Sequence, residues 1–378
     1  MENYLIITNA DMSLQSGDVV LINRRAEEFY KQFNIKTLCL VLNNKKKITH
    51  KTNGLDYKSI NNFEDIKENI IKINPTKIIF YGIRSYSYIS LTKKLIHNFP
   101  YNIEILLDLQ GALEEIIEFK SGLNFIKNYP KYLVKKFIFL KALNKVDGAF
   151  VVSNEMKLYC YAFLKKNMKT NFKIYKVRCG INEVISTEKK ILWRNKIREL
   201  WGIEEDTVVM VFSGYRMPWQ NIDTIIETFK NYDKKIDKIY FAFFCNIDEE
   251  FKNKIKCAFP DGNYYLKFLK FEEYFEYLSA CDLGFLVRDY NITNKVAFPN
   301  KFSDYLNAGL MIAMNKAVPE PFRLLEENNI PYINIEENLN NNLEQIKERH
   351  KNLLTYYGIS ESLCTNELLY SKQIRSLI

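Results

Sequence analysis

The sequence has few of the residues that build disulfide frameworks, metal centres or flexible linkers. Its 378 residues include only 7 cysteines, 3 histidines, 13 glycines and 9 prolines. The cysteines are odd in number, widely scattered and form no C-x-x-C pair, so neither a disulfide framework nor a zinc site is expected. The histidines (His50, His97 and His350) lie far apart in the sequence. This spacing argues against histidine-based metal or triad chemistry.

Long apolar runs are also absent. No run approaches the roughly 18–20 apolar residues that a membrane span requires. The N-terminal sequence has no basic region and no small-residue cleavage site, so we expect no signal peptide and a cytoplasmic location. The chain is 47% hydrophobic and 26% charged, which allows a sizeable core, and its length fits two domains.

Three phosphate-binding signatures are missing. The chain contains no G-x-G-x-x-G, no G-x-x-x-x-G-K-[ST] and no Asp-x-Asp pair of the kind that holds a divalent ion on a diphosphate. The net charge of +9 is compatible with nucleic acid, an anionic membrane or a phosphorylated small molecule as partner. The lysines are spread along the chain and no nucleic-acid-binding module is present, so we do not expect a nucleic-acid partner.

Short apolar runs alternate with helical patterns in both halves of the sequence. The predicted strands cover residues 4–8, 37–42, 77–81, 104–109 and 148–153, and then 208–213, 239–245, 264–270, 283–287, 310–314 and 332–335. This alternation predicts an α/β protein with two doubly wound parallel sheets. We place the first domain at 1–182 and the second at 183–357. Residues 358–378 are expected to form a C-terminal helix that packs back toward the first domain.

The segment 281–309 contains the most concentrated set of candidate binding residues. A buried strand ends at Arg288, a polar loop with Asn294 and Lys295 follows, and a helix begins after Pro299. Ligands of doubly wound sheets bind at the carboxyl ends of the strands, where this loop lies.

The helix after Pro299 brings further polar groups to the same sheet edge. Its first N–H groups, together with Arg288 and Lys301, suit a phosphate group, and Asp304 is one turn further along, within reach of a ribose diol. A capped surface helix with solvated charges is the alternative interpretation.

The residues Arg-x5-Asn-x4-Pro-x-Lys-x2-Asp-Tyr-Leu-x2-Gly, from Arg288 to Gly309, resemble the donor-binding segment of GT-B glycosyltransferases. The resemblance is to the large retaining class, of the family 4-like capsule and lipopolysaccharide type. In that class an acidic residue at the position of Asp304, followed by a tyrosine at the position of Tyr305, grips the nucleotide ribose. A further glutamate of the more familiar pattern is replaced here by Val296.

Other segments resemble the same class in the same order. Residues 211–221 resemble its first strand-to-helix loop near the diphosphate, with Gln220 where many relatives have lysine. Residues 267–271 resemble its base-holding loop, and residues 107–115 resemble a stretch of its first domain. The resemblance therefore assigns donor binding to Gly214, Arg216, Phe268, Leu269, Asn294, Lys295, Asp304 and Tyr305. The acceptor-side candidates are Gly17, Asp108, Gln110 and Glu114.

The resemblance implies a GT-B fold, with two Rossmann-like domains facing across a cleft. It implies transfer of a sugar from a nucleoside-diphosphate sugar to a hydroxyl of a glycan or lipid-linked glycan, in bacterial cell-surface polysaccharide synthesis. The reaction is expected to be retaining and to need neither a metal nor another cofactor. Arg288 and Lys301 are then the catalytic residues, because they meet the charge on the departing diphosphate. A nucleotide-sugar 2-epimerase of the same fold and an inactive partner subunit remain alternatives.

Residues 129–145 mix lysines with aromatic residues at helical spacing. Two interpretations are open. The stretch is either a peripheral contact with the anionic inner face of the cell membrane, or a core-packing helix with a solvated lysine face.

Overall fold

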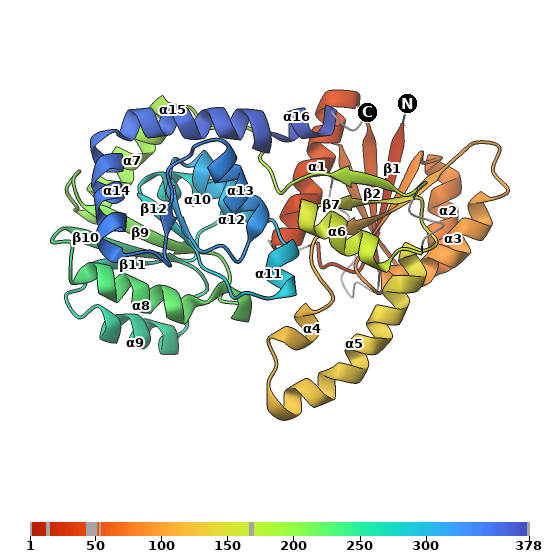
Figure 1. The fold of residues 1–378 in the computed structure, drawn as a ribbon. Coiled ribbons are helices and arrows are strands. Elements are labelled where there is room, and N and C mark those ends of the chain that lie inside the picture. The colour runs from red at the N-terminus through yellow and green to blue at the C-terminus, as the bar shows by residue number, and fades with distance from the viewer. Residues whose placement is uncertain (1, 13–15, 43–50, 53, 166–169, 376–378) are drawn as a thin grey trace. The chain divides into compact units, whose positions relative to one another are not determined.

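The computed structural model describes residues 2–12, 16–42, 51–52, 54–165 and 170–375. The chain forms two compact units (Figure 1). Unit 1 contains the residues up to Asn182, the short stretch Val296–Phe298 and the C-terminal segment from Tyr370. Unit 2 contains Glu183–Lys295 and Pro299–Leu369. None of the helices in the described ranges combines the length and hydrophobicity of a membrane-spanning segment.

Unit 1 is built on one eight-stranded sheet with the strand order β3-β4-β2-β1-β5-β6-β7-β8. All neighbouring strands are parallel except the short β3, which pairs antiparallel with β4. The strands are β1 (Asn3–Thr8), β2 (Lys36–Leu42), β3 (Lys51–Thr52), β4 (Leu55–Ile60), β5 (Lys77–Tyr81), β6 (Glu104–Leu109), β7 (Gly148–Val151) and β8 (Lys173–Lys176). The helices are α1 (Gly17–Phe33), α2 (Phe63–Ile73), η1 (Ser85–Tyr88), α3 (Ile89–Ile96), α4 (Glu115–Glu118), α5 (Gly122–Leu143), α6 (Asn154–Phe163) and α16 (Tyr370–Arg375).

Unit 2 is built on a six-stranded, fully parallel sheet with the order β11-β10-β9-β12-β13-β14. Its strands are β9 (Val208–Ser213), β10 (Ile239–Phe244), β11 (Tyr264–Leu266), β12 (Leu283–Leu286), β13 (Met311–Met314) and β14 (Ile333–Asn334). Its helices are α7 (Thr187–Trp201), η3 (Pro218–Gln220), α8 (Ile222–Asp233), α9 (Glu249–Ala258), α10 (Phe271–Ser279), α11 (Ile292–Val296), α12 (Asn300–Asn307), α13 (Pro319–Glu327), α14 (Leu339–Lys351), α15 (Leu353–Leu363) and η4 (Cys364–Leu368).

The predicted α/β class with two doubly wound sheets is confirmed. In each unit the strand order runs outward from a central strand in one direction and then reverses, at β1/β5 in unit 1 and at β9/β12 in unit 2. Such a reversal leaves a crevice at the carboxyl ends of the two central strands, because the helices on either side of it leave in opposite directions. The central strands are continuous apolar runs, as expected for strands that are covered on both faces.

The C-terminal region differs from the prediction. A helix break was expected near 358, but α14 ends and α15 begins around Asn352, and α15 and η4 both belong to unit 2. Only the segment from Tyr370 belongs to unit 1. There the amide of Tyr370 donates to the Ile181 carbonyl at 2.9 Å, and the Arg178 amide donates to Oε1 of Gln373 at 2.8 Å. The change of unit therefore occurs at Tyr370 rather than at 358.

Candidate functional site

The strand-order reversal of unit 2 brings together the loops that follow β9 and β12. The first loop leads from Gly214 through η3 to α8, and the second leads through Arg288 to α11. The two loops are tied by a 2.7 Å hydrogen bond from Nδ2 of Asn221 to Oδ1 of Asp289. Helix α12 begins beside them, so polar groups from three segments lie at one edge of the sheet.

Arg288 is a buried cation without an acidic partner. Its side chain is 5% exposed, and no carboxylate in the described part of the chain forms an ion pair with it. Its Nη1 atom donates to the Trp219 carbonyl at 3.0 Å, while its backbone is held on both sides by the Asn315 amide. Burial lowers the pKa of Arg288 to about 10, an effect that Tyr305 and Asp289 partly oppose. An anion that reached this guanidinium would supply the missing charge.

Lys301, on the first turn of α12, is a second cation at the same place. Its Nζ atom donates to Oε1 of Gln220 at 2.8 Å and lies 4.2 Å from the centre of the Phe212 ring. Burial and the nearby charge of Arg288 hold the pKa of Lys301 well below its usual value. In the described residues no carboxylate pairs with Lys301 either. Two adjacent cations without acids are a preformed site for a polyanion.

Gly214 gives Lys301 the space it occupies. Its φ of +94° lies in the left-handed region that favours glycine, and a Cβ atom there would stand 2.8 Å from Cε of Lys301. The Gly214 amide donates to the Phe244 carbonyl at 2.7 Å, which fixes the loop to β10. A glycine is therefore required by both the backbone angle and the lysine side chain.

Tyr305 anchors α12 to the sheet. Its hydroxyl accepts a hydrogen bond from the Ser213 amide at 3.1 Å and lies 3.0 Å from Oγ of Ser213, which is itself 2.9 Å from the Tyr274 hydroxyl. A Cβ atom at Gly284 would stand 2.3 Å from the Tyr305 ring. The Tyr305 ring therefore packs directly on β12. The resemblance did not indicate its hydrogen bond to Ser213, at the end of β9.

Arg216 is held by residues that follow β10, and not by the groups around Arg288 and Lys301. Its guanidinium pairs with the Asp248 carboxylate, donates through Nε to the Asn246 carbonyl at 3.0 Å and lies 4.4 Å from the centre of the Phe251 ring. These partners fix Arg216 to the loop and helix that follow β10. Its predicted contact with a diphosphate requires release from Asp248.

The loop that follows β11 presents an exposed aromatic residue. Phe268 is 52% exposed and its ring centre lies 6.3 Å from that of Tyr215, which sequence reasoning did not single out. Leu269 is buried beneath the loop, and Lys267 is bound to Glu273 at 2.7 Å. Exposed rings at a strand's carboxyl end offer a stacking surface for a planar base.

The remaining donor-side residues have different roles in the fold. Asn294 is buried and donates through Nδ2 to the Asp289 carbonyl at 3.0 Å, so it shapes the loop, whereas the side chain of Lys295 is exposed. Asp304 is buried on α12, and its charge helps to raise the pKa of the Cys364 thiol, after the larger effect of burial. Its predicted contact with a ribose stays a prediction.

Two acceptor-side candidates of unit 1 lie near its strand-order reversal: Gly17 follows β1, and Asp108 lies at the carboxyl end of β6, the neighbour of β5. Asp108, at the end of β6, pairs with Arg25 at 2.9 Å and accepts from Nε2 of Gln110 at 2.9 Å. Gly17 begins α1, and the next residue, Asp18, accepts from the Tyr81 hydroxyl at 3.0 Å. These contacts place the carboxylates of Asp108 and Asp18 at one edge of the sheet of unit 1.

Glu114 is engaged by two tyrosines. Its carboxylate accepts from the Tyr132 hydroxyl at 2.9 Å and from the Tyr159 hydroxyl at 2.7 Å, and its side chain is buried. These bonds join the β6–α4 loop to α5 and α6. This geometry gives Glu114 a structural task, which does not require an acceptor.

The most densely charged cluster lies at the opposite edge of the sheet of unit 2. Asp282, directly before β12, is fully buried and pairs with Arg194 at 2.8 Å, Arg198 at 2.6 Å and Arg349 at 2.6 Å. These arginines hold the pKa of Asp282 far below its usual value, against the opposing effect of burial. The cluster fastens α7 and α14 to the amino ends of the strands. We infer that this cluster stabilises the fold of unit 2.

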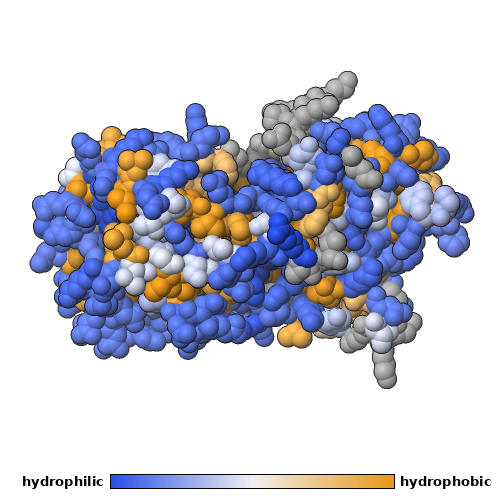
Figure 2. All heavy atoms as spheres, turned by 90° about the horizontal axis from the view of Figure 1, so that it is seen from above, coloured by the Kyte–Doolittle hydropathy of each residue, from blue (hydrophilic) through white to orange (hydrophobic). Residues whose placement is uncertain are grey.

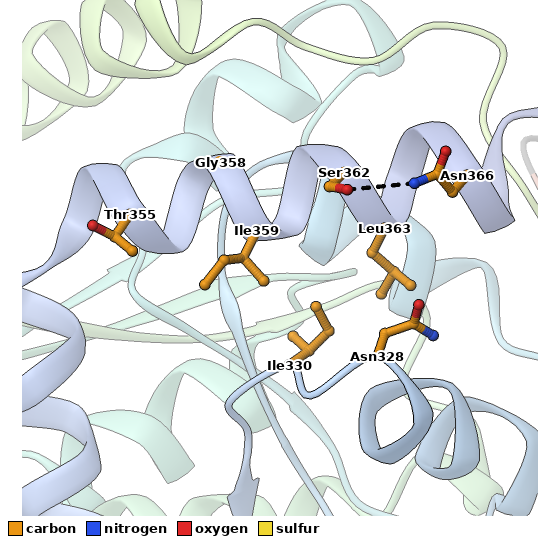
Figure 3. A pocket seen from close by; sticks show the side chains of 8 residues that line it. All are labelled: Asn328, Ile330, Thr355, Gly358, Ile359, Ser362, Leu363 and Asn366. Carbon is orange, nitrogen blue, oxygen red and sulfur yellow. Dashed lines mark hydrogen bonds between the residues drawn. The ribbon is translucent and has the colours of Figure 1, made fainter.

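A hollow of about 370 Å³ also lies outside the candidate site (Figure 3). It lies between α15 and the turn that leads into β14, again on the amino side of a strand, and it contains no charged side chain. The lining residues are Asn328, Ile330, Thr355, Gly358, Ile359, Ser362, Leu363 and Asn366. Among the described residues, no group of three or more His, Cys, Asp or Glu side chains is arranged to hold a metal ion.

Comparison with known proteins identifies the fold class but no family. No protein-family model matches the sequence, and no curated protein matches it significantly. Among solved structures, a sucrose-phosphate synthase from Thermosynechococcus elongatus is similar, with a TM-score of 0.69 at 12% identity over 100% of this chain and 98% of that one. A glycosyltransferase from Rickettsia africae gives a TM-score of 0.64 at 13% identity, covering 100% and 96%.

A third similar structure, from E. coli, is described as trehalose-6-phosphate bound with UDP-2-fluoro glucose. It gives a TM-score of 0.62 at 9% identity and covers 100% of this chain and 98% of that chain. The whole chain therefore has the GT-B fold that the resemblance implied. At these identities the likeness shows the fold alone.

Proposed function

We propose that the chain is a glycosyltransferase that takes its sugar from a nucleoside-diphosphate donor. The observation that carries the proposal is the pair of Arg288 and Lys301 at the strand-order reversal of unit 2. Both cations are largely buried, and neither forms an ion pair with a carboxylate of the residues that the structure describes. A buried charge without a counter-ion is costly, so a site that maintains two of them is built for a ligand that brings negative charge. The GT-B fold of the proteins to which it is similar supports the assignment to a sugar donor.

The diphosphate is proposed to lie against Arg288, Lys301 and the first amides of α12, with Asp304 on the ribose. The exposed Phe268 and its neighbour Tyr215 are proposed to contact the base. When the sugar–phosphate bond breaks, negative charge grows on the leaving diphosphate. Preorganised cations stabilise that charge more in the transition state than in the bound donor, which accelerates the departure.

We propose further that the reaction needs no metal and retains the configuration of the sugar. Its proposed role is in bacterial cell-surface polysaccharide synthesis. Arg288 and Lys301 supply the positive charge that a divalent ion supplies in enzymes with an Asp-x-Asp pair, and this sequence has no such pair. A hydroxyl of a glycan is proposed as the acceptor. Of the acceptor-side candidates in unit 1, Asp108 is the one whose carboxylate lies at the carboxyl end of a strand, β6, next to the central strand β5.

Isothermal calorimetry with UDP and GDP in excess EDTA tests this proposal. We expect one of the two to bind without metal, and binding to be lost in the double variant Arg288→Ala/Lys301→Met. Lys256→Met, at an exposed position of α9, is the matched control and should bind normally. Binding that requires a divalent ion would refute metal independence. If neither diphosphate binds, with or without metal, the donor assignment is wrong.

A further inference from the structure

Helix α5 of unit 1 exposes apolar side chains to an unusual extent. Its large hydrophobic residues Leu123, Phe125, Ile126, Tyr129, Leu133, Val134 and Phe137 are between 40% and 74% exposed. Every residue from 121 to 127 is exposed, and Figure 1 shows α4 and the first half of α5 projecting from the body of unit 1. Among the described residues of unit 1, none covers this part of the helix.

The exposed apolar residues share one face of α5. At about 100° per residue, six of them fall within an arc of roughly 140°. These six are Leu123, Ile126, Tyr129, Leu133, Val134 and Phe137. The residues that α5 buries in unit 1 lie on the opposite side, and they are Tyr132, Phe139, Ala142 and Leu143. The outward face therefore does not form the core, and core packing accounts only for the other side of the helix.

Lysines border this apolar face. The helix carries Lys127, Lys131, Lys135, Lys136 and Lys141 but no acidic residue between Gly122 and Leu143. Lys127 and Lys131 are exposed along one border of the arc, and Lys136 lies on the other, where its Nζ atom is 3.2 Å from the Tyr132 hydroxyl. The nearest acidic residues along the chain are Glu118 of α4, four positions before the helix, and Asp147, four positions after it. We call the six apolar residues together with Lys127, Lys131 and Lys141 the α5 surface.

We propose that the α5 surface docks on a lipid bilayer that contains anionic lipids. An apolar arc bordered by lysines is the pattern of a helix that lies in a membrane interface, with its rings and aliphatic chains among the acyl chains and its lysines at the headgroups. The charge of the surface has a single sign, and an anionic leaflet complements it. This partner is independent of the proposed sugar transfer.

A second copy of the chain fits the same surface less well. A two-fold contact through α5 would set the lysines of one copy against those of the other. Lysine is also depleted at protein–protein interfaces relative to the rest of the surface, so the lysines of α5 argue against a contact between two copies. The face seen from above in Figure 2 shows apolar patches that are interrupted by hydrophilic residues. In the part of the chain that the structure describes, α5 is the longest helix and the one richest in exposed apolar residues.

Vesicle flotation with the full-length chain tests the proposal. We expect binding to vesicles of phosphatidylcholine mixed with phosphatidylglycerol, weak binding to phosphatidylcholine alone, and release at high salt. Since each lysine near an anionic surface strengthens partitioning about fivefold, Lys127→Ala/Lys131→Ala/Lys141→Ala should weaken it about a hundredfold. Leu133→Ser/Phe137→Ser should weaken it at least about tenfold.

Two matched controls separate the α5 surface from general effects of charge and hydrophobicity. Lys252→Ala/Lys254→Ala/Lys256→Ala removes the same charge from α9, and Leu158→Ser/Leu354→Ser removes two leucines that are 66% and 62% exposed. Both controls should bind vesicles like the unaltered chain, and all variants should keep its thermal midpoint. Equal loss in the controls, equal binding to neutral vesicles or no binding at all overturns the proposal. So does a dimer in sedimentation that the α5 variants convert to a monomer.

Discussion

The Nζ atom of Lys301 lies 2.8 Å from Oε1 of Gln220, a neutral amide where a carboxylate would have neutralised the ammonium group. The amide orients the lysine without cancelling its charge. The charge therefore remains available to a ligand, at the cost of a destabilised free protein.

We predict that Lys301→Met stabilises the protein without ligand and abolishes its affinity for a nucleoside diphosphate. The pKa of Lys301 is depressed because burial and Arg288 disfavour the charged form, so removal of the ammonium relieves this cost. A gain of about 0.5–2 kcal/mol is typical of such relief at a binding site. Thermal unfolding with and without the diphosphate measures both effects.

Lys267→Met is the matched control for this stabilisation. Burial acts to lower the pKa of Lys267, but its bonds to Glu273 and Tyr277 outweigh burial and raise the pKa, so the charge is stabilised there. The control should not gain stability. Equal destabilisation of both variants would show that Lys301 is not strained in the free protein.

We further predict that binding of the diphosphate takes up a proton at pH values below the usual pKa of a lysine. An anion beside Lys301 raises the pKa of this lysine again, so the complex holds more protons than the free protein between the depressed pKa and the restored one. Affinity should therefore fall as the pH rises through this interval.

Calorimetry in buffers of different ionisation enthalpy measures the proton uptake directly. The apparent binding enthalpy should depend on the buffer for the unaltered chain and lose much of this dependence in a conservative Lys301→Arg variant. A binding enthalpy that is independent of the buffer at every pH below the usual pKa of a lysine would contradict the prediction.

The strands were largely predictable from sequence, whereas the contacts of the site were not. Residues 104–109 and 208–213 are rich in apolar residues and buried throughout, and both are strands with those bounds. Leu55–Ile60 and Lys173–Lys176 were missed, because their exposed polar and charged residues give no buried run. The bond between Lys301 and Gln220 joins residues 81 positions apart, and only the β9–β12 reversal brings them together. No sequence spacing indicates that Arg194, Arg198 and Arg349 converge on Asp282.

This buried cluster yields a prediction about stability. Asp282→Asn should destabilise unit 2 by about 3–5 kcal/mol, because it leaves three buried arginines without their counter-ion. The folded pKa of Asp282 lies far below that of an unfolded aspartate, so its contribution is complete above about pH 4 and is lost as the pH falls further. Urea unfolding as a function of pH measures both. Asp206→Asn, an exposed partner of Lys238, should change little, and a similar loss in both variants would contradict the prediction.

We predict that Asp304→Asn lowers affinity for the diphosphate while leaving the fold intact. The change keeps the size of the side chain but removes the charge that is proposed to accept hydrogen bonds from both ribose hydroxyls. Calorimetry should show a loss of affinity for UDP or GDP at an unchanged thermal midpoint. Normal binding together with a lower midpoint would show that Asp304 serves the packing of α12 beside η4.

The last prediction concerns Arg288. In the described part of the structure, its hydrogen bonds to backbone carbonyls use Nη1 alone, which leaves the other guanidinium donors for phosphate oxygens. Arg288→Lys keeps the charge but loses the forked geometry. Because charge on the leaving diphosphate grows in the transition state, the rate of donor cleavage should fall by about 10²–10³ while donor affinity falls much less. Single-turnover cleavage of the nucleotide sugar that binds, measured beside its affinity, decides this.

The control Arg323→Lys, on the half-exposed surface of α13, should change neither quantity. Equal losses of rate and affinity would make Arg288 a residue of ground-state binding, and no loss in either would remove it from the site.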